Sequence, residues 1–226
     1  ARQSGVLQQV PSKAINKDIR KDLLDSDSYW APITYRSRII VYSNERVQKS
    51  ELSTYEDLAN PKWKKRLLVR SSSNAYNQAL MSSIVANLGS DATEKWSSGV
   101  VANFARDPKG SDRDQVKAIA AGQGDLAIVN SYYIGLLLAS EKEEEIKAGN
   151  SVSVFFPNQG AENRGSHVNI SAIGLTKNSP NRENAINRLN LLDEELGEQK
   201  FIASDDYSVA DITALCAIDF GGLAQI

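Results

Sequence analysis

Short apolar runs bounded by polar residues alternate along this chain with segments of helical spacing, and this alternation limits the folds that it can adopt. The clearest runs are SRIIVYS (37–43), DLAIVN (125–130) and SVSVFF (151–156). Their β-branched composition and polar boundaries predict buried strands. Strands that alternate with helices along the whole chain predict an α/β fold with largely parallel sheets.

Several helices can be placed with their ends. Residues 77–88 have apolar side chains at helical spacing and are followed by a glycine, which predicts a helix that stops at Leu88. Residues 113–121 follow two capping candidates, Ser111 and Asp112. The sequence therefore predicts where the first of these helices ends and where the second begins.

Two further helical segments are expected. Ser53, with Glu56 three residues later, has the pattern of a capping box and predicts a helix start. A longer helix is expected after Tyr133 through Glu145, where the charged run EKEEE predicts a solvated face.

The residue content excludes several classes of function. The chain of 226 residues has one cysteine, Cys216, and one histidine, His167, which excludes a disulfide framework and makes multi-histidine metal sites and most catalytic triads untenable. Lys and Arg total 26 against 28 Asp and Glu, a net charge of −2, so no nucleic-acid partner is expected. No apolar run is long enough for a membrane span, and the first residues lack the apolar core of a signal peptide.

Tyrosine is the residue type best placed for metal chemistry. Tyr132 and Tyr133 follow a predicted strand that ends at Asn130, and Tyr76 lies in a polar loop between a strand and a helix. Ligands bind beyond the carboxyl ends of strands in open α/β sheets, so these phenols could converge on a hard trivalent cation. The alternative is that one ring of the pair packs in the core while the other lies at its rim.

The polar loop before the predicted helix has two interpretations as well. Ser72, Ser73 or Asn74 can cap the helix, or the free amides at its N-terminus can hold an anion. His167, alone on an alternating strand, is expected to be a packed or surface residue rather than a ligand.

Five segments together resemble the periplasmic ferric-ion-binding proteins, the substrate-binding components of iron ABC transporters. The resemblance covers about residues 1–190, and SSSNAYNQ and NSYYIG are its most specific motifs. The segments are RSRIIVY (36–42), STYEDLANPKWKKRLLVRSSSNAYNQAL (53–80), VANFARDPKGSDRDQVKAIAAGQGDLAIVNSYYIG (101–135), VSVFFPNQ (152–159) and RGSHVNISAIGLTKNSPNRENAI (164–186).

The resemblance implies a two-lobed, type II periplasmic binding-protein fold. We expect residues 1–40 with 161–226 to form one lobe and residues 41–160 the other. It also implies a monomeric, non-enzymatic periplasmic carrier that binds Fe(III) in the cleft between the lobes and delivers it to an ABC permease for iron uptake. The implied iron ligands are Tyr76, Tyr132 and Tyr133.

A synergistic anion such as carbonate is implied beside the iron. Arg36 and Arg38 lie in a stretch expected near the cleft, and Ser72 and Asn74 lie in the loop that precedes the predicted helix. These four residues are the weaker candidates for contact with that anion.

The two ends of the chain depart from this family. Its members begin with an extended strand and helix, so this sequence is expected to be truncated at the N-terminus. Residues 189–220 depart at the other end, because from about Tyr207 they resemble the C-terminal helical domain of glutathione transferases, with a Ser208-x-x-Asp211 capping box. Neither fold is completed by this junction, so an assignment artefact is favoured over a fusion or chance similarity.

Two alternative functions remain from the sequence. The C-terminal segment suggests a glutathione-transferase-like enzyme, although no thioredoxin-like glutathione-binding domain precedes it. The other alternative is a binding protein of the same architecture that holds a different small ion. Adjacent tyrosines favour iron over a polyamine, which would prefer carboxylates and stacked aromatic rings.

Overall fold

The computed structural model describes residues 3–10 and 21–187 of the chain. The chain divides into two compact units. Arg36–Asn169 forms the larger unit, and Ala1–Tyr35 with Ile170–Ile226 forms the smaller unit. All three tyrosines of the predicted site therefore belong to the larger unit.

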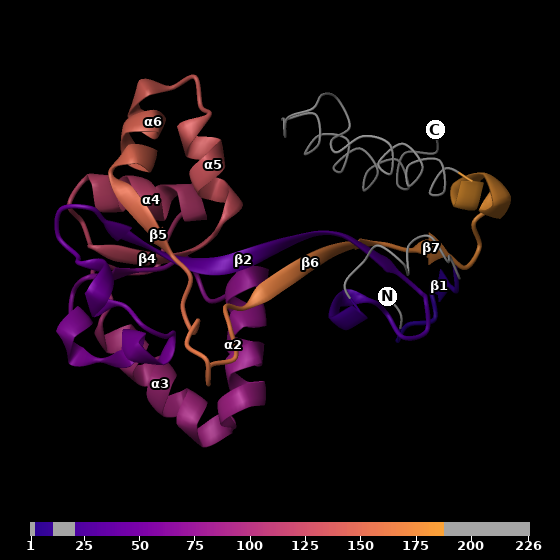
Figure 1. Ribbon diagram of the computed structural model, residues 1–226, viewed down its shortest axis with the longest axis horizontal. Coiled ribbons are helices and arrows are strands. Elements are labelled where there is room, and N and C mark those ends of the chain that lie inside the picture. The colour runs from indigo at the N-terminus through magenta and orange to yellow at the C-terminus, as the bar shows by residue number, and fades with distance from the viewer. Residues whose placement is uncertain (1–2, 11–20, 188–226) are drawn as a thin grey trace. The chain divides into compact units, whose positions relative to one another are not determined.

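A mixed β-sheet is the centre of the larger unit (Figure 1). Its strand order is β3-β4-β2-β5, and β6 also pairs with β2. The strands are β2 (Ala31–Ser43), β3 (Leu67–Leu68), β4 (Leu126–Asn130), β5 (Val152–Phe155) and β6 (Val168–Ile173).

The expectation of a largely parallel sheet is wrong for β2. β3 pairs in parallel with β4, with Leu67 opposite Leu126, but β2 is antiparallel to both of its neighbours β4 and β5. The register of the β2–β4 pair places Arg38 opposite Asn130. Apolar composition predicts that a strand is buried, but it carries no information on the direction in which the strand runs.

Helices connect the strands that share one direction. Between β3 and β4 lie α2, α3 and α4, and between β4 and β5 lie α5 and α6. Their bounds are α2 Ala75–Leu88, α3 Ser90–Ala102, α4 Asp112–Ala120, α5 Tyr132–Leu138 and α6 Glu143–Asn150. Short 3-10 helices cover Lys21–Leu23, Lys49–Glu51, Glu56–Ala59 and Pro61–Trp63.

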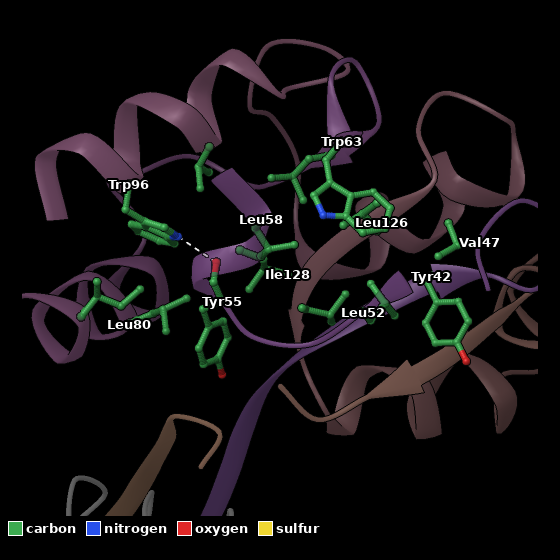
Figure 2. Close-up of a cluster of buried hydrophobic side chains, with 14 residues drawn as sticks. Tyr42, Val47, Leu52, Tyr55, Leu58, Trp63, Leu80, Trp96, Leu126 and Ile128 are labelled. Atoms are coloured by element: carbon green, nitrogen blue, oxygen red, sulfur yellow. Dashed lines mark hydrogen bonds between the residues drawn. The ribbon is translucent and has the colours of Figure 1, made fainter. Parts of the chain in front are cut away.

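Alternate residues of β2 enter two separate cores. Ile40 and Tyr42 pack in the cluster that includes residues of α2 and α3, shown in Figure 2. Ile39 and Val41 pack in the cluster that includes residues of α4, α5 and α6. The helices lie on both faces of the sheet (Figure 1), as the period of two along a strand requires.

The predicted caps of two helices are confirmed. The side chain of Asn74 accepts a hydrogen bond from the backbone amide of Tyr76, and α2 ends at Gly89, whose φ of 79° suits glycine. Ser111 caps α4 and forms a capping box with Asp114.

Two helix predictions are wrong. A single helix from Tyr133 to Glu145 is replaced by α5 and α6, separated by residues 139–142. The helix expected from Ser53 is a 3-10 helix that begins at Glu56, and the side chain that bonds its first turn is that of Thr54, which accepts from the amide of Asp57 at 3.2 Å. Ser53 instead accepts a bond from the amide of Asn158 with its backbone carbonyl.

The described part of the smaller unit contains a two-stranded antiparallel sheet. It pairs β1 (Leu7–Gln8) with β7 (Leu175–Thr176). Residues 182–187 are helical, and the transferase-like segment 189–220 lies outside the described residues.

The predicted lobe 41–160 falls within the larger unit, and the exact lobe boundaries remain a prediction. Among the described residues, no helix is both long and apolar enough to cross a bilayer.

Candidate functional site

Tyr76 is held at the first turn of α2. The Asn74 side chain accepts from the Tyr76 amide at 3.0 Å, which fixes the turn that carries this ring. The preceding loop is tied internally, because the Ser71 and Ser73 hydroxyls lie 2.8 Å apart. The position of Tyr76 therefore follows from a cap that the sequence predicts.

Tyr132 and Tyr133 begin α5 directly after β4. The strand ends at Asn130, and the amide of Ser131 donates to the carbonyl of Ser37 on β2 at 2.9 Å. This bond continues the sheet to the residue before the tyrosine pair. The two rings have centroids 4.3 Å apart and are tilted by 31°, so the adjacent phenols lie on one side of the helix start.

Tyr132 interacts with both of the other tyrosines. The pKa of Tyr132 is raised, first by burial and then by side-chain hydrogen bonding with Tyr133 and Tyr76. Its ring is half-exposed, with 37% of the residue accessible. The structure thus brings together the phenols that the sequence predicts as iron ligands, and it keeps Tyr132 protonated at neutral pH.

A positive charge lies beside this cluster. The guanidinium carbon of Arg36 is 5.2 Å from the centroid of the Tyr76 ring, within the range of a cation–π contact. Arg36, one of the four predicted anion contacts, therefore lies next to a phenol ring of the cluster.

The geometry of Arg38 favours a structural role over the predicted contact with an anion. Arg38 is 1% exposed, and its Nη1 atom lies 2.6 Å from the Oδ2 atom of Asp112 in a fully buried ion pair. Nη1 also donates to Asn130 at 3.2 Å, and Nη2 donates to Asn77 at 2.5 Å. Burial lowers the pKa of Arg38, while the charge of Asp112 opposes that effect.

The two loop candidates differ in their environment. The side-chain oxygen of Asn74 is used as the cap of α2, and Ser72 is exposed in the loop before it. Neither observation tests their predicted contact with an anion.

His167 is half-buried immediately before β6. Burial lowers the pKa of its imidazole, so the ring is neutral at pH 7. Its backbone carbonyl accepts from the amide of Arg38 at 2.9 Å. This position agrees with the expectation of a packed residue.

Sequence reasoning missed the polar residues behind the tyrosines. Asn77 and Asn130 lie within the two tyrosine motifs, so their position beside the phenols was the available signal. Asp112 was recognised only as a possible helix cap, and its complete burial against Arg38 has no local sequence signal.

Phenol oxygens are the ligands that this site offers to a metal ion. Within residues 3–10 and 21–187, no group of three or more His, Cys, Asp or Glu side chains could hold one. Phenolate is a hard oxygen donor, which suits a hard, highly charged cation. The donor set therefore fits Fe(III) better than a soft or borderline metal.

Known proteins resemble the chain over most of its length. The sequence profile of the bacterial extracellular solute-binding proteins matches residues 1–200. Iron uptake protein A1 of Synechocystis sp. is 44% identical over 207 residues, which are 92% of this chain and 57% of that protein.

Solved structures of iron-related proteins are also similar to this chain. Apo FutA2 from Synechocystis PCC6803 has a TM-score of 0.80 and 46% identity, over 85% of this chain and 61% of that one. The Trichodesmium protein (IdiA) (FutA) in complex with iron and citrate ligands has a TM-score of 0.81 and 46% identity, over 85% of this chain and 60% of that one. The chain thus spans 57% to 61% of the length of these three proteins. The likenesses confirm the predicted fold class, an α/β chain of the two-lobed type II binding-protein fold.

Proposed function

Because the chain belongs to the family of bacterial extracellular solute-binding proteins, we propose that it binds ferric iron through the phenolate oxygens of Tyr76, Tyr132 and Tyr133. The names of its relatives support iron as the cargo, since one is an iron uptake protein and one solved structure holds iron and citrate. The observation that carries the ligand assignment is the proximity of the phenols: the rings of Tyr132 and Tyr133 have centroids 4.3 Å apart, and Tyr132 also interacts with Tyr76.

Charge explains why phenols suit this cargo. Three phenolates together carry a charge of −3, which neutralises Fe(III), whereas three neutral oxygen ligands would leave the full charge in a partly buried place. The raised pKa of Tyr132 means that iron has to displace a proton to bind. Binding is therefore coupled to proton release and strengthens as the pH rises.

A small anion completes this proposal. Carbonate can fill coordination positions that the three tyrosines leave open and can approach the guanidinium of Arg36, which already contacts the Tyr76 ring. Arg36→Ala is expected to weaken the dependence of iron binding on bicarbonate. The same dependence in Arg36→Ala and in the unmodified protein would remove Arg36 from the site.

The protein acts in this proposal as a carrier rather than an enzyme. Iron is bound and released without any covalent change, and a lobed binding protein gains affinity from contacts that form on closure around its cargo. Delivery is to an ABC permease from the periplasm, by a monomer. The solute-binding family and the iron uptake relative, which is longer than this chain, support the carrier role.

Competition with a chelator tests the proposal. Apparent iron affinity is measured with Fe(III)–nitrilotriacetate for the unmodified protein and for Tyr76→Phe, Tyr132→Phe and Tyr133→Phe. Each substitution removes one anionic ligand and is expected to reduce affinity by at least about tenfold. Tyr42→Phe is the matched control, because Tyr42 packs in the core cluster of Figure 2.

The two outcomes are distinct. Loss of affinity in the three site variants, with the affinity of Tyr42→Phe unchanged, supports phenolate ligation. Unchanged affinity in all three folded site variants contradicts it.

A further inference from the structure

We infer that Arg38, paired with Asp112, is a positioning residue that holds the two tyrosine-bearing segments together so that their phenols can share one iron ion. This inference rests on the proposed function and deepens it. It concerns neither a ligand nor an anion contact, since Arg38 is 1% exposed.

The guanidinium of Arg38 joins two segments that are far apart in the sequence. Nη2 donates to Oδ1 of Asn77 at 2.5 Å, and Nη1 donates to Oδ1 of Asn130 at 3.2 Å. Asn77 directly follows Tyr76, and Asn130 lies two residues before Tyr132. One planar group therefore sets the spacing between both tyrosine motifs.

Asp112 completes the same arrangement from α4. Its Oδ2 atom accepts from Nη1 of Arg38 at 2.6 Å and from the backbone amide of Asn130 at 2.7 Å. Its Oδ1 atom lies 3.4 Å from Nη1 of Arg70. The end of β4 is thus fixed through its backbone as well as its side chain, immediately before α5 begins.

The bond from Arg38 also determines how the amide of Asn130 faces the tyrosines. Since Oδ1 accepts from Arg38, Nδ2 is presented on the other side of the amide. Nδ2 is buried and has no hydrogen-bond partner among the described residues.

The side-chain nitrogen of Asn77 forms hydrogen bonds with the loop before α2. Its Nδ2 atom donates to the carbonyl of Arg70 at 2.9 Å and to that of Ser71 at 3.2 Å. Arg38 thus acts on a residue that itself holds the loop leading to Tyr76. Packing alone would supply none of this directionality, because apolar contacts do not fix the rotation of an amide.

A buried ion pair at this place argues for positioning rather than for stability. Such a pair is often no more stabilising than apolar residues of similar volume, because both charges lose their hydration. Apolar residues cannot replace the directional hydrogen bonds of this pair. Arginine is specifically required, since one fork reaches an aspartate and two amides, whereas lysine is a single point charge.

Arg38→Lys is the test variant, because it keeps the charge opposite Asp112 while it removes the fork. We expect it to fold, to lower iron affinity about 10- to 100-fold, and to weaken or shift the phenolate-to-iron absorption band. Arg66→Lys is the matched control, because Arg66 pairs with Asp125 at 2.6 Å in the same unit. Its iron affinity is expected to equal that of the unmodified protein.

A double substitution separates positioning from general damage. If Arg38 acts through the tyrosine pair, Arg38→Lys causes little further loss of affinity in a Tyr132→Phe background. An equal loss in both backgrounds overturns the inference, as do unchanged affinity and an unchanged absorption band in folded Arg38→Lys. Should Arg38→Lys fail to fold, Asn77→Ala keeps the ion pair intact, and an unaltered affinity in that variant overturns the inference.

A measurement without metal distinguishes this inference from the proposed function. The adjacent rings of Tyr132 and Tyr133 shift each other's proton resonances, so the NMR signals of the metal-free protein report the spacing between the two rings. We expect Arg38→Lys to move these signals and Arg66→Lys to leave them in place. Moved signals in a protein that binds no iron contradict the proposed function alone, whereas unmoved signals contradict the positioning role.

Discussion

The hydroxyl of Tyr55 donates a hydrogen bond to the backbone carbonyl of Arg38 inside the larger unit. The same hydroxyl accepts from the backbone amide of His167 at 3.1 Å. Tyr55 is completely buried, and its own carbonyl accepts from Nε1 of Trp96 at 2.7 Å (Figure 2). One phenol therefore joins β2, at the backbone of Arg38, to the residue before β6.

Tyr55→Phe is expected to lower the free energy of unfolding by about 1–3 kcal/mol, because it leaves the buried carbonyl of Arg38 without its donor and the partly buried amide of His167 without its acceptor. Urea unfolding measures the change. Tyr42→Phe, in the same core cluster, is the control and should alter the free energy of unfolding much less. Equal effects of the two substitutions would show that the Tyr55 hydroxyl contributes nothing specific.

Alkaline pH provides a separate test of the same group. Burial raises the pKa of Tyr55 to about 12 from an ordinary value of 10. The stabilisation that this neutral phenol provides is therefore complete below pH 10 and is lost as the pH rises through about 12. The difference in unfolding free energy between the unmodified protein and Tyr55→Phe should shrink between these values. A constant difference across that range would mean that Tyr55 does not titrate as described.

The sequence predicts several strands and the caps of two helices correctly, because these depend on local pattern. The runs around Ile39, Ala127 and Val154 read as strands, and Asn74 and Ser111 cap helices as expected. The direction of β2 and the break between α5 and α6 were not predicted, because pairing direction and tertiary packing are not encoded in the spacing of apolar residues.

The cap of α2 should contribute to stability and to the position of Tyr76. Asn74→Ala removes the acceptor of the Tyr76 amide and is expected to lower the free energy of unfolding by about 1 kcal/mol. Asn74→Ser keeps an acceptor and should recover most of the loss. Thermal or urea unfolding of both variants is the measurement, and equal stability of Asn74→Ala and Asn74→Ser would contradict the role of the cap.

Glu145 should make the protein sensitive to acid. Its carboxylate accepts from Lys117 at 2.8 Å and from Ser140 at 2.7 Å, and hydrogen bonding from Lys117 lowers its pKa to about 2. The stabilisation is present above the ordinary pKa of 4.5 and is lost as the pH falls towards about 2. Glu145→Gln should reduce this loss on acidification, and Glu143→Gln, at an exposed position of the same helix, should not. A matching acid profile for both variants would contradict the assignment.

The sequence predicts the tyrosines of the candidate site but not the buried polar residues behind them. The motifs predict Tyr76, Tyr132 and Tyr133 as ligands, and in the structure Tyr132 interacts with both of the other two. Arg38 was expected to contact an anion, but it is buried against Asp112, a residue distant from it in the sequence. The exposure of a side chain cannot be read from residue type alone, because a long-range partner decides whether an arginine faces solvent or the core.

The most direct test of the account is a visible absorption titration of the metal-free protein with chelated Fe(III), with and without bicarbonate. We expect a phenolate-to-iron charge-transfer band that saturates at one iron per protein. The band should strengthen with bicarbonate and be lost or greatly weakened in Tyr132→Phe. A folded protein that develops no such band, or a band that Tyr132→Phe leaves unchanged, would contradict iron binding through these tyrosines.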